Sequence, residues 1–260
     1  PIEALQASAH LDADRLSPLE LRLSVGDTDL RLAGTLDRLG ADPILDLTLD
    51  AVLALTEIRH FLGLAPELTG SARLHLAAKG KLADPEARMT LAYDGGLLAG
   101  FPVERIDLGL HLAERKLRID PLAVESRFGM SAATGELDLR KAFPGGFLSP
   151  DRALDAAAYR LAVRQTGLVL EKALSPEAGY AGRLEADLTL EGRGTALREM
   201  LARCRLGLTG KGISAPGMGH PVDAAAAVRG GIEDGEALLE ALTVEDRKST
   251  RLNSSHRIRS

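Results

Sequence analysis

Apolar and polar residues alternate along most of this chain with a period of two residues. In VERIDLGLHLAERKLRIDPLAVES, residues 103–126, apolar residues take every second position from Ile106 up to the connector AERK, and the alternation resumes after it. A period of two places successive side chains on opposite faces of a strand. The stretch therefore predicts an antiparallel hairpin with one apolar face and one wet face.

The same alternation recurs elsewhere in the chain. It appears in LELRLSVGDTDLRLAGTLD (residues 19–37, with a predicted turn at Gly26–Asp27), in ILDLTLD (44–50), in GSARLHLAAKGKL (70–82) and in GRLEADLTLEGRG (182–194). Two of these strands align without gaps, because each lies between glycines ten residues apart, at 70 and 80 and at 182 and 192. Counted from these glycines, the apolar residues of the two strands also occupy the same alternate positions, which indicates a weak two-copy repeat.

Three short helices are predicted between the strands. Residues 54–63 have apolar residues at helical spacing, with Thr56 as the candidate N-cap and Gly63 as the stop. Residues 168–179 take the comparable place before the second repeated strand, and residues 195–204 follow it, with Thr195 as the cap. The repeating unit is then strand, short helix, glycine, long strand, glycine.

Glycine and proline concentrate in AFPGGFLSPDR, residues 142–152, which predicts a boundary or an insertion loop. The expected organisation is a first β-groove segment over residues 1–143, a loop over 144–157, a second groove segment over 158–245 and a tail over 246–260.

Composition limits how the apolar faces are covered. Hydrophobic residues make up 45% of the 260 residues, but aromatic residues only 3%, and Trp is absent. With so few aromatic residues and amphipathic helices, an apolar sheet face must close into a barrel, stack on a second sheet, or curl into a gutter that holds an apolar ligand. The pattern favours a sandwich or solenoid and a lipid gutter equally. For the gutter, the predicted lining residues are Leu47, Leu49, Leu74, Leu76, Ile106, Leu108, Leu110, Leu112, Leu117, Ile119, Leu122, Val124, Leu184, Leu188 and Leu190.

The last fifteen residues differ from the rest of the chain. DRKSTRLNSSH, residues 246–256, resembles the frame translation of sequencing-adapter DNA, so we expect residues 246–260 to be a non-native, disordered tail, with Asp246 ambiguous. The formal net charge is −5, and it becomes −9 without the five basic residues and one acid of this tail. An acidic body argues against a nucleic-acid partner.

No motif predicts catalysis. The histidines at 10, 60, 75, 111 and 220 lack metal-ligand spacing, and GLTGKGIS (207–214) lacks the spacing of a phosphate-binding loop. Cys204 is the single cysteine, which excludes an internal disulfide, and a buried hydrophobe is its simplest interpretation. The sequence therefore predicts neither an enzyme nor a cofactor or metal site.

One stretch carries a family resemblance. YAGRLEADLTLEGRGTALREMLARCRLGLTGKG, residues 180–212, resembles the AsmA-like superfamily of Gram-negative bacteria in its order of glycine, alternating strand, Gly-x-Gly, small hydroxyl residue, short Leu-rich helix and Leu-x-Gly-x-Gly. ELTGSARLHLAAKGKLADPEARMTL, residues 67–91, resembles the TamB branch. The resemblance covers most of residues 15–245, and its degenerate motifs indicate a superfamily and not one member.

The resemblance implies a mainly β fold, in which a long, curved, antiparallel-rich sheet (a β-taco or groove) has a hydrophobic concave face and a few short helices. It also implies an inner-membrane anchor at the N-terminus, not contained in this sequence, a periplasmic location and phospholipid transport to the outer membrane. We thus expect an internal fragment of a longer protein with phospholipid as its partner. Two alternatives remain open, a scaffold for outer-membrane protein assembly with a β-barrel partner and a secreted β-solenoid or adhesin.

Overall fold

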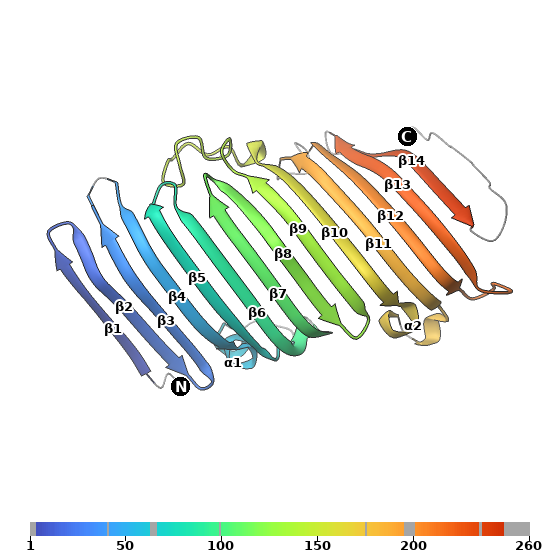
Figure 1. Ribbon diagram of the computed structural model, residues 1–260, viewed down its shortest axis with the longest axis horizontal. Coiled ribbons are helices and arrows are strands. Elements are labelled where there is room, and N and C mark those ends of the chain that lie inside the picture. The colour runs from blue at the N-terminus through green and yellow to red at the C-terminus, as the bar shows by residue number, and fades with distance from the viewer. Residues whose placement is uncertain are drawn as a thin grey trace. The chain divides into compact units, whose positions relative to one another are not determined.

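The computed structural model is mainly β, with 72% of the residues in strands. It describes residues 4–40, 42–62, 67–98, 100–174, 176–194, 201–233 and 236–246. Fourteen strands form one open sheet, in which every strand pairs with its neighbours in sequence, as Figure 1 shows. This antiparallel order follows from the short connections, because consecutive strands joined by tight turns must reverse direction.

The strands are long, between nine and fourteen residues each. Their bounds are β1 (Ala4–Asp12), β2 (Arg15–Val25), β3 (Thr28–Asp37), β4 (Ile44–Ala54), β5 (Ser71–Lys81), β6 (Glu86–Leu98), β7 (Phe101–Ala113), β8 (Lys116–Ser126), β9 (Gly129–Asp138), β10 (Ala158–Val169), β11 (Ala181–Arg193), β12 (Leu201–Ser214), β13 (Val222–Glu233) and β14 (Glu236–Asp246).

The helices in the described part of the chain are short. They are α1 (Leu55–Leu62), α2 (Leu170–Ala173) and the 3-10 turns Leu154–Ala156 and Pro176–Ala178. Because α1 begins at Leu55, Thr56 lies inside the helix and the prediction that it caps the helix was wrong. The stop predicted at Gly63 lies outside the described residues.

The helix predicted over residues 195–204 is wrong at its C-terminal end. Leu201–Cys204 belongs to β12, where Leu201 pairs with Arg193 and Cys204 with Leu190, while residues 195–200 lie outside the described residues. The Leu-Ala-Arg-Cys stretch fits an alternating strand as well as a helix, and pairing with β11 decides between them.

The chain divides into two compact units. Unit 1 consists of residues 1–124 and 138–152, and unit 2 of residues 125–137 and 153–260. The loop predicted as a boundary runs between β9 and β10, and most of it belongs to unit 1. Asp246, which we had assigned to the tail, ends β14 and pairs with Ala224, and residues 247–260 lie outside the described residues.

A glycine lies near the start of each strand of the predicted repeat, Gly70 just before β5 and Gly182 as the second residue of β11, for a steric reason. Gly70 has a φ of +96° and Gly182 a φ of +114°, a region that side chains rarely adopt. A Cβ atom would lie 2.1 Å from the carbonyl oxygen of Gly95 at the first position and 2.6 Å from that of Gly212 at the second. Only glycine therefore allows the neighbouring strand to approach so closely.

Few side chains are fully buried. Among the described residues, eight hydrophobic ones lose nearly all solvent contact, and six of these are alanines. The other two are Leu45 and Tyr93. A sheet with so small a buried core is not covered by a second layer over most of its area.

Candidate functional site: an uncovered apolar sheet face

Strand register in unit 1 aligns the apolar residues into rows that cross the sheet. One row runs from Leu32 through Leu49, Leu76 and Met89 to Leu110. The next row runs from Leu30 through Ala51, Leu74 and Leu91 to Leu108. Except for buried Ala51, every residue of both rows stays partly exposed. We call the surface made by these rows and their neighbours on the same side of the strands the apolar face.

The predicted lining residues of unit 1 lie along these strands. Leu47 and Leu49 are on β4, Leu74 and Leu76 on β5, and Ile106, Leu108, Leu110 and Leu112 on β7. The strand register places all of them on the same side of the sheet. Leu117 and Ile119 alternate with the exposed Arg118 and Asp120 on β8. Leu122 and Val124 follow after Pro121, where the spacing of the apolar residues changes from two to three.

Unit 2 has its own apolar rows. Leu188 of β11 pairs with Val163 and Leu206, and the row continues through Val228 to Leu242. Leu184 and Leu190 lie on the same side of β11, where half-buried and exposed residues alternate without interruption from Gly182 to Arg193. Cys204 pairs with Leu190 in the neighbouring row and is half-buried.

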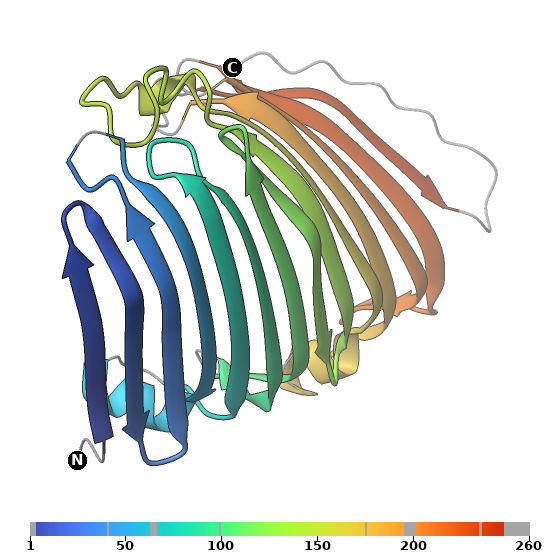
Figure 2. The same ribbon diagram turned by 60° about the vertical axis from the view of Figure 1, so that its left-hand side comes forward.

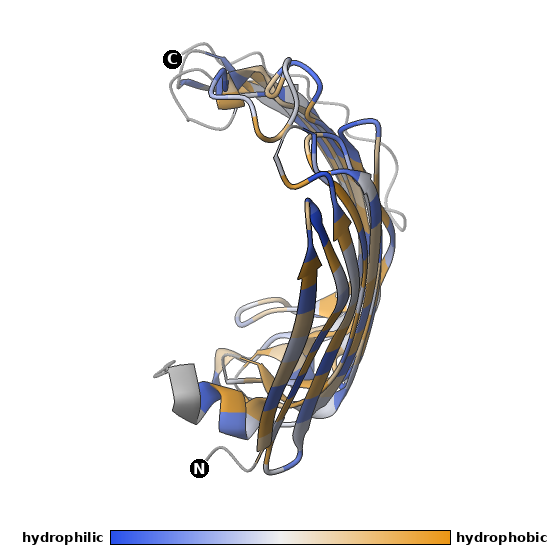
Figure 3. Ribbon diagram, turned by 90° about the vertical axis from the view of Figure 1, so that its left-hand side faces the viewer, coloured by the Kyte–Doolittle hydropathy of each residue, from blue (hydrophilic) through white to orange (hydrophobic). Residues whose placement is uncertain are grey.

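The apolar face of unit 1 lies on the inner side of its bent strands. The strands curve along their length, and α1 lies inside the curve, as seen in Figures 2 and 3. Thr28 has the same parity on β3 as Leu30 and Leu32, and its hydroxyl reaches Glu57 of α1. The side chains of the apolar rows therefore point to the side on which α1 lies. The bands of hydropathy across the strands in Figure 3 follow the same alternation.

Glu57 fixes α1 at one end of the apolar face. Its carboxylate accepts a hydrogen bond from the Asp27 backbone N–H at 3.0 Å and one from the Thr28 hydroxyl at 2.9 Å. Thr28 Oγ1 in turn accepts from the Ala54 N–H at 3.0 Å. The Asp27 N–H and then the Thr28 hydroxyl lower the pKa of Glu57, because both stabilise the ionised carboxylate.

Tyr93 closes the apolar face near the same end. It is 2% exposed, the most completely buried large side chain among the described residues, and its hydroxyl donates to the carbonyl oxygen of Thr69 at 2.8 Å. Burial raises the pKa of its phenol. The hydroxyl of Thr69 accepts from the Leu97 N–H at 2.9 Å, so the segment before β5 is held to β6 by both contacts.

At the opposite end of the strands, a loop reaches across two hairpin turns. We call residues 138–152 the strap. The Phe147 N–H donates to the Ala83 carbonyl at 2.7 Å in the β5–β6 turn, and the rings of Phe143 and Phe147 pack 5.0 Å apart between centroids. Ala142 is fully buried. The strap thus places the Phe143–Phe147 ring pair at the rim of the sheet.

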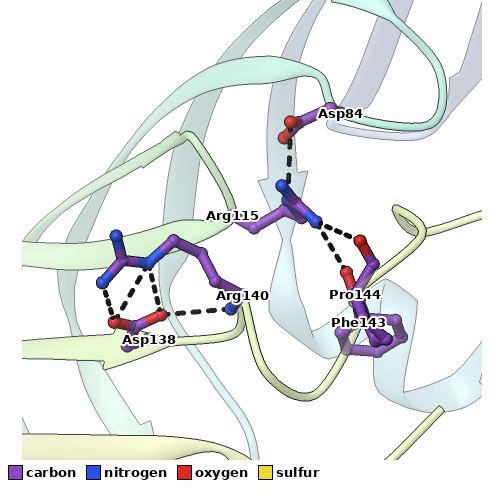
Figure 4. Close-up of polar contacts among 6 residues, drawn as sticks. All are labelled: Asp84, Arg115, Asp138, Arg140, Phe143 and Pro144. Carbon is purple, nitrogen blue, oxygen red and sulfur yellow. Dashed lines mark hydrogen bonds and ion pairs between the residues drawn. The ribbon is translucent and has the colours of Figure 1, made fainter.

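Arg115 holds the strap, as Figure 4 shows. One of its guanidinium nitrogens donates to the carbonyl oxygens of Phe143 at 2.8 Å and Pro144 at 2.9 Å. Its buried Nε has no hydrogen-bond partner, but it lies 3.4 Å from a carboxylate oxygen of Asp84, which makes an ion pair. Arg115 and Glu114 form the two-residue β7–β8 turn, with φ values of +56° and +51°. Both backbones are in the left-handed region that favours glycine.

A second ion pair stiffens the start of the strap. Arg140 donates from Nε at 3.0 Å and from a terminal nitrogen at 2.5 Å to the two carboxylate oxygens of Asp138. The side-chain hydrogen bond from Arg140 lowers the pKa of Asp138 to about 2. This arrangement of both residues is also drawn in Figure 4.

The opposite face of the sheet carries the charged residues. The His75 ring Nδ1 lies 2.7 Å from a carboxylate oxygen of Asp50 on the neighbouring strand, and a cross-strand ion pair joins Arg73 to Asp94 at 2.7 Å in unit 1. Arg164 and Asp187 form one at 2.7 Å in unit 2. All are well exposed, so each contributes at most about 1 kcal/mol. Their main effect is to keep this face wet and to penalise a shifted strand register.

A groove of about 1000 Å³ lies on this charged face of unit 1. Its polar lining residues include Asp29, Arg31, Asp107 and His75, most of which are joined in ion pairs with one another or with their neighbours. The groove and the apolar face are therefore on opposite sides of the same strands. Its charges already compensate one another, which leaves the apolar face as the candidate site.

The part of the chain that the structure describes contains no group of His, Cys, Asp and Glu side chains that could hold a metal ion. Across the same residues, the helices are too short and too polar to cross a membrane. The glycines of GLTGKGIS lie in β12, where the strand register with β13 shifts between Gly210 and Ile213.

Sequence reasoning missed the groups that close the two ends of the apolar face. Glu57 contacts residues about 30 positions earlier in the chain, and Arg115 contacts residues 28 and 29 positions later. No local pattern marks such contacts. The one available signal was the unusual Glu-Arg pair in a hairpin turn, where glycine and asparagine are favoured. In comparisons with protein-family models, curated proteins and solved structures, nothing matches this chain.

Proposed function

We propose that this chain is the periplasmic part of an inner-membrane-anchored, AsmA-like protein whose apolar face shields lipid acyl chains during phospholipid transport to the outer membrane. The observation that carries the proposal is the row Leu32–Leu49–Leu76–Met89–Leu110, which crosses five strands in register and stays partly exposed. An apolar face of this extent is unstable in water without an apolar cover. The sequence resemblance at residues 67–91 and 180–212 supports the inner-membrane anchor and the periplasmic location.

The dimensions of the row suit an acyl chain. Five strands at about 4.8 Å spacing make a row about 19 Å long, and one acyl chain spans about 15 Å, half the hydrocarbon core of a bilayer. Each CH₂ group removed from water contributes about 0.8 kcal/mol. Branched and flexible Leu and Met side chains adapt to a mobile chain better than flat aromatic surfaces do. Because α1 and the strap lie at the two ends of the strands, the middle of the apolar face is left for the ligand.

The test compares adjacent substitutions on opposite faces. Leu188→Asp and Leu91→Asp each place a charge on an apolar row, while Thr189→Asp and Thr90→Asp place the same charge one residue away on the wet face. Phospholipid that co-purifies with each full-length variant is extracted and quantified by mass spectrometry. We expect a several-fold loss of bound phospholipid for the leucine variants and no loss for the threonine variants. Wild-type protein without phospholipid, or equal loss in all four variants, would refute the proposal.

A second candidate is a scaffold for outer-membrane protein assembly. The observation in its favour is β14, which pairs with β13 alone among the described strands and in which Leu238, Leu239, Leu242 and Val244 are between 41% and 56% exposed. An exposed edge of this kind accepts an added strand by β-augmentation. Site-specific photocrosslinking from residue 243 in cells distinguishes the two functions, because capture of an outer-membrane barrel protein supports the scaffold and capture of phospholipid alone supports transport.

A further inference from the structure

Unit 2 carries a polar side chain on the side of its apolar rows. Gln165 of β10 follows Val163 by two residues, so both side chains lie on the same side of the strand, and Gln165 pairs with Ala186 of β11. From Ala186 the row crosses the sheet through apolar residues, namely Leu208, Ala226 and Val244. Gln165 therefore places an amide at the start of a row that is otherwise apolar.

Ser131 of β9 fixes the position of this amide. It precedes the buried Ala133 by two residues, and its hydroxyl donates to Gln165 Oε1. The amide nitrogen Nε2 of Gln165 donates to the carbonyl oxygen of Thr166 at 3.3 Å, which is long for a hydrogen bond. A primary amide has two N–H donors. Within the part of the chain that the structure describes, Nε2 has no second acceptor, so one N–H of Gln165 is available to a ligand.

A β-bulge lies directly beside Gln165. The register with β11 shifts between Gln165 and Leu168, so Thr166 and Gly167 stand opposite Glu185 alone. Gly167 has a φ of +65°, in the left-handed region that favours glycine. Bulges re-aim neighbouring side chains and are common next to active sites. Regular strand pairing is thus interrupted at the point where the Gln165 amide and the Thr166 carbonyl meet.

The surroundings of the Gln165 amide favour a neutral acceptor. Its neighbours on the same side of β10 and β11, Val163 and Ala186, carry no charge. Arg164, the nearest basic residue on β10, lies on the wet side, where it forms an ion pair with Asp187 at 2.7 Å. A phosphate or carboxylate bound at the amide would lose water without gaining a cation, which costs much free energy. A carbonyl oxygen is neutral and accepts the same hydrogen bond at a smaller desolvation cost.

We propose that the Gln165 amide donates a hydrogen bond to an acyl-ester carbonyl of the phospholipid whose chains cover the apolar rows of unit 2, and that Ser131 is a positioning residue for this amide. The proposal rests on the proposed function and names the part of the lipid that is recognised. A hydrocarbon chain over the amide would remove its free N–H from water without a partner, which is unfavourable. An ester carbonyl supplies the missing acceptor.

A pair of lipids that differ only in their ester carbonyls tests the proposal. Diheptanoyl phosphatidylcholine contains them, and its di-O-heptyl ether analogue has the same headgroup and chain length without them. Calorimetric titration of the full chain with each lipid, below its micellar concentration, gives the two dissociation constants. We expect the wild type to bind the ester lipid about fivefold more tightly, as one net hydrogen bond allows. In Gln165→Leu this preference should disappear, because leucine keeps the row apolar and removes the donor.

Control variants separate recognition from folding. Gln6→Leu makes the same change on the wet side of β1, where Gln6 pairs with Arg22, and should keep the wild-type preference. Ser131→Ala should reduce the preference, and Ser131→Thr, which keeps a hydroxyl, should retain it. Equal affinity of the wild type for both lipids, or an unchanged preference in Gln165→Leu, would overturn this inference and leave the proposed function standing. Binding of neither lipid would refute both.

Discussion

Two kinds of apolar residue are present in this protein, and they differ in what covers them. Tyr93 is enclosed and hydrogen-bonded to Thr69, whereas Leu76 lies in an open row with part of its surface exposed. Sequence predicted that Leu76 points to an apolar face, because alternation alone sets the direction of each side chain. It did not distinguish a covered residue from an uncovered one, since cover comes from segments distant in the chain.

The first prediction follows from this difference. We expect Tyr93→Ala to reduce the free energy of unfolding by about 3–5 kcal/mol, as for a large aromatic residue removed from a closed core. Leu76→Ala should cost about 1 kcal/mol, because a partly exposed leucine loses little burial and leaves no closed cavity. Urea unfolding of both variants measures the two values. A loss of 3 kcal/mol or more for Leu76→Ala would show a dry, closed core instead of an open face.

The second prediction concerns Asp138. Its pKa is lowered to about 2 by Arg140, so it contributes stability that is complete above the unfolded-state pKa near 3.9 and is lost as the pH falls towards 2. We expect Asp138→Asn to lose about 1 kcal/mol or less at pH 7, since the pair is partly exposed. The difference from wild type should vanish near pH 2. Unfolding curves between pH 7 and pH 2 check the amplitude, and a carboxyl NMR titration of Asp138 checks the midpoint.

At the scale of elements, the strands can be predicted from the sequence, but the positions of α1 and the strap at the ends of the apolar face cannot. The turn at Gly26–Asp27 and the hairpin around residues 113–116 lie where alternation stops, because a turn needs a break in the period of two. Leu201–Cys204 was predicted as helix, since a short Leu-rich stretch fits both periods and pairing with β11 decides the outcome. The docking of the strap was not predictable, because Arg115 and Phe143 are 28 residues apart.

The third prediction tests the strap. Arg115→Gly suits the left-handed backbone of the turn but removes two hydrogen bonds to the carbonyls of Phe143 and Pro144. Charge-assisted hydrogen bonds contribute about 1.5–3 kcal/mol, so hydrogen exchange at the Phe147 amide should accelerate at least tenfold. Glu114→Gly makes the same backbone change one residue earlier and should leave that exchange rate unaltered. Similar acceleration in both variants would mean that the turn, and not the Arg115 side chain, holds the strap.

At the scale of the whole molecule, the open sheet leaves more apolar surface in water than a layered fold of the same composition would. If acyl chains cover the apolar face, lipid must stabilise the folded state by mass action. The fourth prediction is that a micellar or short-chain phospholipid at a hundred times its dissociation constant raises the free energy of unfolding by about 2.7 kcal/mol. Thermal unfolding with and without lipid measures this, with Leu188→Asp expected to show a smaller increase and Thr189→Asp the full one.

The sequence by itself determined that this protein is built from long antiparallel strands, each with one apolar and one wet face, because a period of two residues is a local property of the backbone. It also specified which leucines share a face within each strand. Only the tertiary structure decided that the sheet stays open and that α1 and the strap close the ends of the apolar face in unit 1. These outcomes depend on contacts such as Glu57–Thr28 and Arg115–Phe143, which join residues far apart in the chain and leave no trace in local periodicity.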